Sequence, residues 1–347
     1  MPTNPATVRT VDCPRCGAPA LSSFRFCEAC GAALRDDAPP ARRGTDWVSS
    51  TAPPEECPAC GGTAFSPEGY CEGCGQRGPT GPDRSAYDLG LLAGVSDIGH
   101  RHQRNEDAMA LGVLPGTALA VVCDGVSSSS RGDAASHAAV DAALPVLRDA
   151  VRDGAGAQKA IELSAEAARV AVAAAAGPET GNPPSCTYVA AVVTAGTVTV
   201  GWIGDSRAYW LPYGAAPVCL TTDDSLANEL IAAGTPPADA YAAPHAGALV
   251  RWLGVDADDG PPKVVTIAPE TPGRLIVCSD GLSRYRSAPA ELAASTPPGA
   301  PLPVAHHLTK LALDAGGVDN ITVVVVPYPP AQSGTTPQPD ARPAEPR

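Results

Sequence analysis

Short apolar runs alternate with longer amphipathic stretches through the middle of the chain. Apolar positions three or four residues apart predict helices over 132–153, 156–176, 223–234 and 302–316. Runs rich in β-branched residues predict strands at 91–99, 118–124, 186–195, 197–205, 207–211, 263–269, 274–280 and 321–326. The helices come in pairs between groups of strands, which disfavours the regular strand–helix alternation of a parallel, doubly wound sheet.

The two ends of the chain differ from this middle region. Residues 1–78 hold four CxxC pairs and little that could form an apolar core, and the chain after Pro327 is polar and proline-rich. We therefore expect two small modules, a main domain and a tail, separated by linkers. The expected boundaries are 1–35 and 57–78 for the modules, 36–56 and 79–86 for the linkers, 87–327 for the main domain and 328–347 for a disordered tail.

The N-terminal cysteines form an internal repeat, because the pattern CPxCG-x9-CExCG occurs twice. Each copy offers four thiolates, the number that tetrahedral zinc requires, and four Cys ligands leave no open position for catalysis. Disulfides or redox pairs are the alternative, which the absence of a signal peptide disfavours. We predict two zinc ribbons, each with one structural Zn²⁺, and the ligands Cys13, Cys16, Cys27, Cys30, Cys57, Cys60, Cys71 and Cys74.

Charge and composition limit the classes of partner that the chain is expected to bind. The sequence has 24 Lys and Arg against 37 Asp and Glu, a formal net charge of -13, and no cluster of cations. Nucleic-acid binding is therefore disfavoured, and a protein partner is expected for the zinc ribbons. No apolar stretch approaches the roughly 20 residues of a membrane span. The metal-type cysteine spacing predicts a cytoplasmic protein, and the Ala-, Gly- and Pro-rich composition is typical of a GC-rich bacterium.

Carboxylates stand at the ends of several predicted strands, where a solvated surface position fits poorly. A carboxylate at the end of a buried strand is costly unless a cation neutralises it. Oxygen ligands that converge from several segments suit Mg²⁺ or Mn²⁺. The candidate carboxylates are Glu106, Asp107, Asp124, Asp205, Asp280 and Asp319.

The order of the motifs resembles that of a known family. The segments SDIGHRHQRNEDAM, VVCDGVSSSSRGDAAS, CTYVAAVV, VGWIGDSRAYWL, LIVCSDGL and GGVDNITVVVV are similar to those of PP2C-type (PPM) metal-dependent serine/threonine protein phosphatases. The similarity covers about residues 88–327. It implies an α+β fold, a four-layer α/β/β/α sandwich of two antiparallel sheets flanked by helix pairs, here preceded by two small zinc ribbons.

The resemblance also implies roles for individual residues. Two Mn²⁺ or Mg²⁺ ions would hold a hydroxide that attacks phosphorus directly in phosphoserine or phosphothreonine, so that no protein nucleophile is needed. The phosphoprotein substrate would be a Ser/Thr kinase or one of its targets, and the enzyme would oppose a bacterial protein kinase. Asp124 would bridge the two ions, with the Gly125 carbonyl, Asp280 and Asp319 completing the first site, Glu106 holding the second, Asp107 orienting waters and Asp205 binding a third, weaker ion.

Three positions depart from the family pattern. His102 stands where the family has its phosphate-binding arginine, flanked by Arg101 and Arg104. His102 either binds phosphate when protonated or fills space when neutral. Arg284 replaces an aspartate that many relatives carry, so a third ion at Asp205 would lack one ligand. Residues 126–131 also replace the glycine-rich run of the family. Together these departures support an alternative function, that of a catalytically silent scaffold that acts through its zinc ribbons.

A second phosphatase signature is present in the sequence. Cys278 and Arg284 match the Cys-x5-Arg loop of cysteine-dependent phosphatases, but Asp280 lies inside that loop and would repel the phosphate. We therefore expect Cys278 to be an apolar residue of a buried strand, as are Cys123, Cys186 and Cys219. The segment 223–250 corresponds to the variable flap of the family, and its stretch 234–245 is expected to be mobile and to influence substrate choice.

Overall fold

The computed structural model describes residues 10–12, 19–21, 46–50, 63–64, 66, 71–73, 83–176, 181–258 and 260–330. The chain divides into two compact units, Met1–Pro40 and Ala41–Arg347. In the first unit, β1 (Thr10–Asp12) pairs antiparallel with β2 (Pro19–Leu21). Of the predicted zinc ligands, Cys71 is described and is buried. The other seven cysteines, and residues 331–347 of the expected tail, lie outside the described residues.

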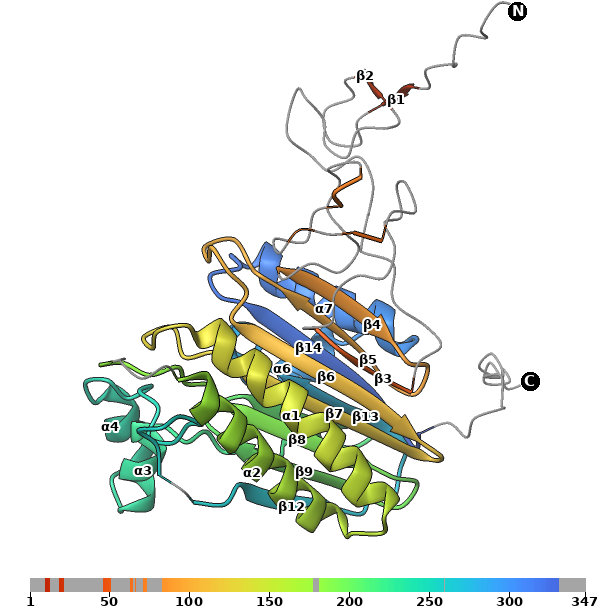
Figure 1. Cartoon of the computed structure of the whole chain (residues 1–347). Helices are drawn as coiled ribbons and strands as arrows, with labels where there is room; N and C mark the ends of the chain where they lie inside the picture. The colour runs from red at the N-terminus through yellow and green to blue at the C-terminus, as the bar shows by residue number, and fades with distance from the viewer. Residues whose placement is uncertain are drawn as a thin grey trace, which may run out of the picture. The chain divides into compact units, whose positions relative to one another are not determined.

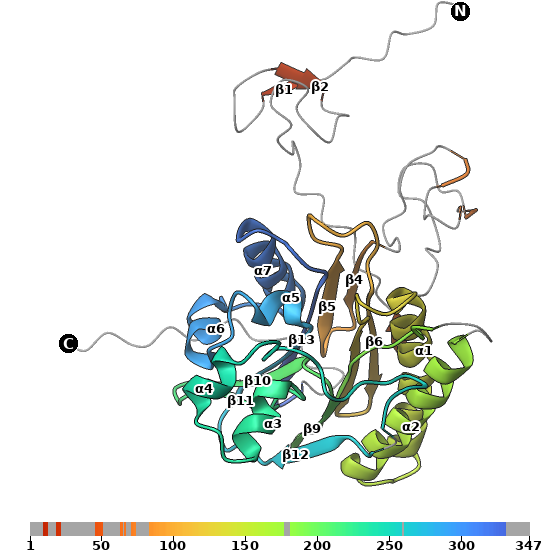
Figure 2. The ribbon, with the colours of Figure 1, turned by 90° about the vertical axis from the view of Figure 1, so that its left-hand side faces the viewer.

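Two six-stranded antiparallel sheets form the second unit. We call them the α1-side sheet and the α7-side sheet, after the helices that cover them (Figures 1 and 2). The α1-side sheet has the order β12 (Lys263–Ile267), β9 (Val198–Ile203), β8 (Tyr188–Val193), β7 (Thr117–Asp124), β6 (Asp107–Leu114) and β3 (Trp47–Ser49). The α7-side sheet has the order β11 (Val218–Cys219), β10 (Arg207–Pro212), β13 (Gly273–Cys278), β14 (Ile321–Tyr328), β5 (Ala93–Asp97) and β4 (Arg84–Asp88).

Helices cover the outer faces of both sheets, as Figure 2 shows. The long pair α1 (Gly132–Arg152) and α2 (Ala157–Ala175) packs on the α1-side sheet. The helices α5 (Asp280–Ser283), α6 (Pro289–Ser295) and α7 (Pro301–Asp314) pack on the α7-side sheet. Between β11 and β12 the chain forms α3 (Leu226–Ala232) and α4 (Pro237–Ala242), which contact each other. The predicted four-layer α/β/β/α sandwich is confirmed.

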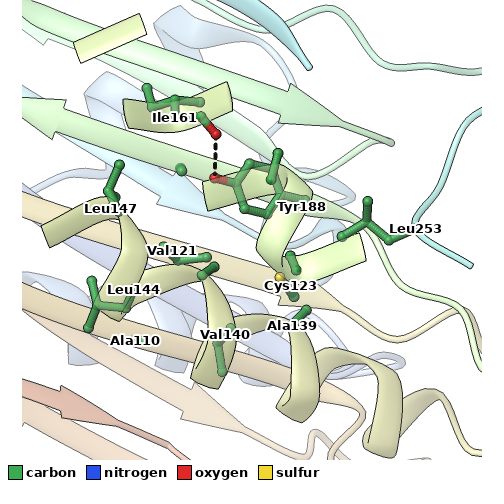
Figure 3. Close-up of a cluster of buried hydrophobic side chains, with 14 of the residues drawn as sticks. Ala110, Val121, Cys123, Ala139, Val140, Leu144, Leu147, Ile161, Tyr188 and Leu253 are labelled. Carbon is green, nitrogen blue, oxygen red and sulfur yellow. Dashed lines mark hydrogen bonds between the residues drawn. The ribbon is translucent and has the colours of Figure 1, made fainter. Parts of the chain in front are cut away.

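The central strands read as continuous apolar runs because both of their faces are buried. In β7, Leu119, Val121 and Cys123 pack against the helices, whereas the alternate residues Ala118, Ala120 and Val122 face the other sheet. Figure 3 shows the helix-side cluster around Tyr188, whose hydroxyl donates to the carbonyl oxygen of Ile161 at 3.4 Å. This layered core fixes the strand register, and with it the position of every residue at the strand ends.

The structure differs from the sequence prediction where short elements lie in proline-rich segments. The expected linker 36–56 contains β3, which pairs with β6 so that Trp47 lies opposite Gly112 and Ser49 opposite Ala110. Val48 is 5% exposed and joins the core between the sheets, which explains why this segment is ordered as a strand. The expected linker 79–86 likewise contains the start of β4. A short helix, α4, lies within the stretch 234–245, whose mobility stays a prediction. Within the described residues, no helix combines the length and apolar character of a bilayer-crossing segment.

Candidate active site

The fold gathers the predicted carboxylates at one end of the sandwich, between the two sheets. Strand register places Asp107, the first residue of β6, opposite Asp124, the last residue of β7. Asp280 follows β13 by two residues, and Asp319 precedes β14 by two. The hydroxyl of Ser279 joins the sheets, because it donates to Asp107 Oδ2 at 2.7 Å. Strand ends that are far apart in sequence are therefore held within hydrogen-bonding distance.

Two glycines allow the backbone segments of the site to approach each other. A Cβ atom on Gly125 would lie 2.6 Å from the backbone of Gly132 and 2.8 Å from the carbonyl oxygen of Glu106. A Cβ atom on Gly281 would collide with the carbonyl oxygen of Asn320. Packing thus explains why glycine follows aspartate at 124–125 and at 280–281. Only glycine lets the backbone after each aspartate lie against the neighbouring segment.

Asn320 and Ser279 position the site and were not among the predicted site residues. The side chain of Asn320 accepts from the backbone N–H of Glu106 at 2.8 Å and donates to the carbonyl oxygens of Ile98 and Arg104. Ser279 also accepts from the backbone N–H of Thr322 at 3.0 Å. Their only sequence signal is adjacency to Asp319 and Asp280, because hydrogen bonds between residues 43 to 222 positions apart leave no local pattern.

Burial and mutual repulsion make the carboxylates reluctant to ionise. Burial, with added repulsion from Asp280 and Asp319, raises the pKa of Asp107 to about 7, against the opposing effect of the Ser279 hydrogen bond. Burial and the neighbouring carboxylates also raise the pKa of Asp124 and of Asp205, the latter to about 7. Asp280 has a raised pKa for the same reasons, although Arg284 counteracts them. The cluster is therefore one that added cations would stabilise.

Two side chains of the protein already contact this cluster. Nη2 of Arg284 lies 3.0 Å from Oδ2 of Asp280 and 3.0 Å from Oδ2 of Asp319. Nε2 of His102 lies 3.1 Å from Oδ1 of Asp319. His102 thus points at a predicted metal ligand, and both of its predicted roles stay open.

The other predicted phosphate-binding cations lie further out. Arg101 is exposed, and Nη1 of Arg104 lies 3.6 Å from Oδ2 of Asp133, with its side chain 69% exposed. Glu106 is half-buried, which raises its pKa, and its carboxylate accepts a hydrogen bond from Ser127 in the loop after Gly125. The structure therefore brings Glu106, Asp107, Asp124, Asp205, Asp280, Asp319 and His102 into one neighbourhood and leaves Arg101 and Arg104 at its rim.

The residues of this cluster fit divalent cations in their chemistry. Oδ1 of Asp107 is buried and has no hydrogen-bond partner, which is unfavourable unless a further group satisfies it. The available donors are carboxylate and carbonyl oxygens, the ligands of Mg²⁺ and Mn²⁺. As they stand, no three Asp, Glu, His or Cys side chains of the described residues are drawn together closely enough to hold a metal ion.

The cysteine-phosphatase signature has no chemical support. Cys278 is fully buried in β13, and burial raises the pKa of its thiol. A nucleophilic cysteine needs the opposite environment, with nearby positive charge that favours the thiolate. The prediction that Cys278 is a core residue is confirmed, since it packs in the cluster between the α7-side sheet and its helices. Cys123 and Cys186 are also buried, and Cys219 is half-buried.

Comparisons with known proteins match both parts of the chain. The double zinc ribbon family matches residues 13–75. The serine/threonine protein phosphatase PstP of Mycobacterium tuberculosis is 32% identical over 235 residues, or 67% of this chain and 44% of the relative, so this chain spans less than half of that protein's length. The serine/threonine phosphatase stp of Listeria innocua is 32% identical over 219 residues, which cover 60% of this chain and 83% of that relative.

Solved structures agree with the sequence matches. The crystal structure of M. tuberculosis PstP has a TM-score of 0.56 and 28% identity, over 67% of this chain and 96% of that chain. A structure of the PstP catalytic domain in complex with 2 manganese ions has a TM-score of 0.55 and 26% identity, over 68% and 97%. The protein phosphatase 2C family matches residues 94–310, which include every predicted active-site residue except Asp319. This chain belongs to the protein phosphatase 2C family.

Proposed function

We propose that this protein is a metal-dependent phosphatase that hydrolyses phosphoserine and phosphothreonine in proteins. The observation that carries the proposal is the convergence of Asp107, Asp124 and Asp280, whose pKa values are all raised by burial and by neighbouring carboxylates such as Asp319. A cluster of this kind is unfavourable in a merely structural role and favourable around divalent cations. The similarity to PstP and stp, which are serine/threonine phosphatases, supports the same activity.

Each residue has a defined task in the proposed site. Two divalent cations, Mn²⁺ or Mg²⁺, would supply an activated water and neutralise the phosphoryl oxygens. Asp107 is fixed by Ser279 through Oδ2, which leaves the buried Oδ1 without a hydrogen-bond partner. Asn320 fixes the backbone of Glu106. Asp124 is proposed to serve both ions, with the Gly125 carbonyl, Asp280 and Asp319 completing the first site. Glu106 would hold the second ion, Asp107 would orient metal-bound water, and Asp205 would bind a weaker third ion.

The N-terminal modules complete the proposal. The match of residues 13–75 to the double zinc ribbon family supports two structural Zn²⁺ ions held by the eight cysteines. With a formal net charge of -13 and no cationic cluster in the sequence, their partner is proposed to be a protein, and the phosphatase to oppose a Ser/Thr kinase in the cytoplasm.

The test is hydrolysis of p-nitrophenyl phosphate and of a phosphothreonine peptide by the full chain, with Mn²⁺ and with EDTA. We expect turnover that requires Mn²⁺, that is lost in Asp280→Asn and that persists in Cys278→Ser. The cysteine variant is the matched control, because Cys278 lies two residues from Asp280 but is buried in the core. Turnover that survives in EDTA, or that is lost only in Cys278→Ser, would refute the metal-dependent mechanism.

One observation favours a second function, that of a catalytically silent scaffold. The guanidinium of Arg284 contacts both Asp280 and Asp319, as a cation would in a site that no longer takes up metal. Folded protein without turnover at any Mn²⁺ or Mg²⁺ concentration would establish this function instead of catalysis.

A further inference from the structure

Arg284 holds two carboxylates with a single nitrogen atom. Its Nη2 lies 3.0 Å from an oxygen of Asp280 and 3.0 Å from an oxygen of Asp319. The short helix α5 creates this contact, because it places Arg284 one turn after Asp280, with the backbone N–H of Arg284 donating to the Asp280 carbonyl at 2.8 Å. One positive charge is thus shared between two strand ends that also meet across Gly281.

The other nitrogen atoms of the Arg284 guanidinium do not hold it in place. The side chain of Arg284 is 48% exposed, and within the described part of the chain its Nη1 and Nε atoms form no hydrogen bond. Arg207, on the neighbouring strand β10, differs: it binds both oxygens of Asp223 at 2.8 and 2.7 Å and also Tyr209. Arg207 is fixed by several bonds, whereas Arg284 can leave by breaking the contacts of one nitrogen.

We propose that Arg284 is a built-in counter-ion that competes with metal for Asp280 and Asp319. In the metal-free protein its charge offsets the repulsion between the two carboxylates. Asp280 and Asp319 would hold a divalent cation in the place where they now hold Arg284, and the charge of that cation would repel the guanidinium. Arg284 therefore lowers the affinity of this site for metal while it stabilises the metal-free fold. The inference rests on the proposed function, because it takes Asp280 and Asp319 as metal ligands.

Arg284 is proposed to raise the stability of the metal-free protein and to lower its affinity for metal. These opposite effects distinguish the proposed role from a merely structural one. A residue that only supports the fold would, when replaced, weaken both the metal-free protein and its metal binding. Replacement of a competitor weakens the metal-free protein but strengthens metal binding. The role also differs from that of a phosphate-binding residue, whose loss would leave metal affinity unchanged.

The experiment is calorimetric titration of Mn²⁺ into the full chain, purified with zinc, together with the Tm of each protein in EDTA. The variants are Arg284→Gln, Arg284→Lys and, as a matched control, Arg286→Gln. Arg286 lies on the same segment but bonds to Ser295 and to the Tyr285 carbonyl, away from the carboxylates. We expect Arg284→Gln to bind Mn²⁺ about tenfold more tightly than the wild type and to have a lower Tm in EDTA, with Arg284→Lys in between and Arg286→Gln unchanged in affinity.

Mn²⁺ affinity in Arg284→Gln that is equal to or weaker than in the wild type would overturn the inference, and so would the absence of Mn²⁺ binding in both proteins. Binding that appears in Arg284→Gln and is undetectable in the wild type would support it most strongly. Because the readout is binding and not turnover, the inference and the proposed catalytic function fail separately: a silent scaffold would still show the change in affinity.

Discussion

The two sheets form opposite walls of one carboxylate cluster, and they differ in how their charges are neutralised. On the α1-side sheet, Asp107 is 1% exposed, and neither it nor Asp124 has an ion-pair partner among the described residues. On the α7-side, the side chains of Asp280 and Asp319 are 30% and 23% exposed, and both contact Arg284. Asp319 contacts His102 as well.

The two walls therefore contribute to metal dependence in different ways. The α1-side wall holds carboxylates with no cationic side chain beside them, so a proton or a metal ion must neutralise them, and this wall governs how far the fold gains from metal. The α7-side wall has its own cations, so it governs how tightly metal is held against them.

The largest effect is expected for Asp124→Asn, measured as kcat on p-nitrophenyl phosphate at saturating Mn²⁺. We expect a fall of about a thousandfold, because the carboxylate proposed to face both cations loses its charge. Asp319→Asn, which alters one wall and one cation, is the comparison and should fall less, by about a hundredfold. Circular dichroism would confirm that both variants fold. Equal losses in the two variants would remove the functional distinction between the walls.

The next effect concerns pH and the metal-free protein. The pKa values of Asp107 and Asp205 are raised to about 7, whereas an unfolded carboxyl group ionises near pH 4. Between these values the folded state binds more protons than the unfolded state, so stability falls as pH rises from about 4 to 7. We expect the Tm in EDTA to fall by about 10 °C from pH 5 to pH 8, and Mn²⁺ to restore more of it at pH 8.

The control for this pH effect is Asp107→Asn. Burial lowers the pKa of His137 and of His306, and these groups act in the opposite direction at the acidic end of the range. The variant keeps both histidines and removes one raised carboxyl group, so its Tm should depend less on pH. A wild-type Tm that rises from pH 5 to pH 8 would show that the pKa values of these carboxyl groups are not raised in the folded protein.

The smallest effect compares the walls directly by the Tm in EDTA at pH 7.5. Asp107→Asn should raise the Tm by about 2–4 °C, because it removes a buried charge and keeps an oxygen for the Ser279 hydrogen bond. Asp319→Asn should lower the Tm by a similar amount, because Arg284 and His102 both lose a charged partner. Shifts of the same sign in the two variants would contradict the comparison between the walls.

The strands of the two sheets and the positions of the site carboxylates are predictable from the sequence for the same physical reason. Strands such as β7 and β13 are buried on both faces, so each is a continuous apolar run, and the first carboxylate after the run marks its end. Asp124 and Asp280 are conspicuous because each is followed by a glycine that the packing requires. Asp107 is predictable only from the motif, since the pairing that places it opposite Asp124 is a matter of register.

The remaining features depend on contacts that no local pattern records. β3 is a three-residue strand in a segment flanked by prolines, and it exists because Val48 fills the edge of the core. α4 begins at Pro237 and has six residues, too few for a helical period to emerge. The hydrogen bond between Ser279 and Asp107 joins residues that meet only once both sheets are in place. The double contact of Arg284 joins the ends of β13 and β14, which lie side by side only once these two strands have paired.

The edge strand β3 has a practical consequence for dissecting the protein. It comes from the segment between the predicted cysteine modules, yet it covers β6, the strand that begins with Asp107. Its Ser49 hydroxyl also donates to Asp141 of α1 at 2.8 Å. A fragment that starts at residue 81 would lack this strand and expose an unpaired β6 edge, which is a template for self-association. Oligomers formed by such a fragment would report a missing edge strand and not the native assembly, so mutation of the cysteines is the cleaner way to remove the zinc modules.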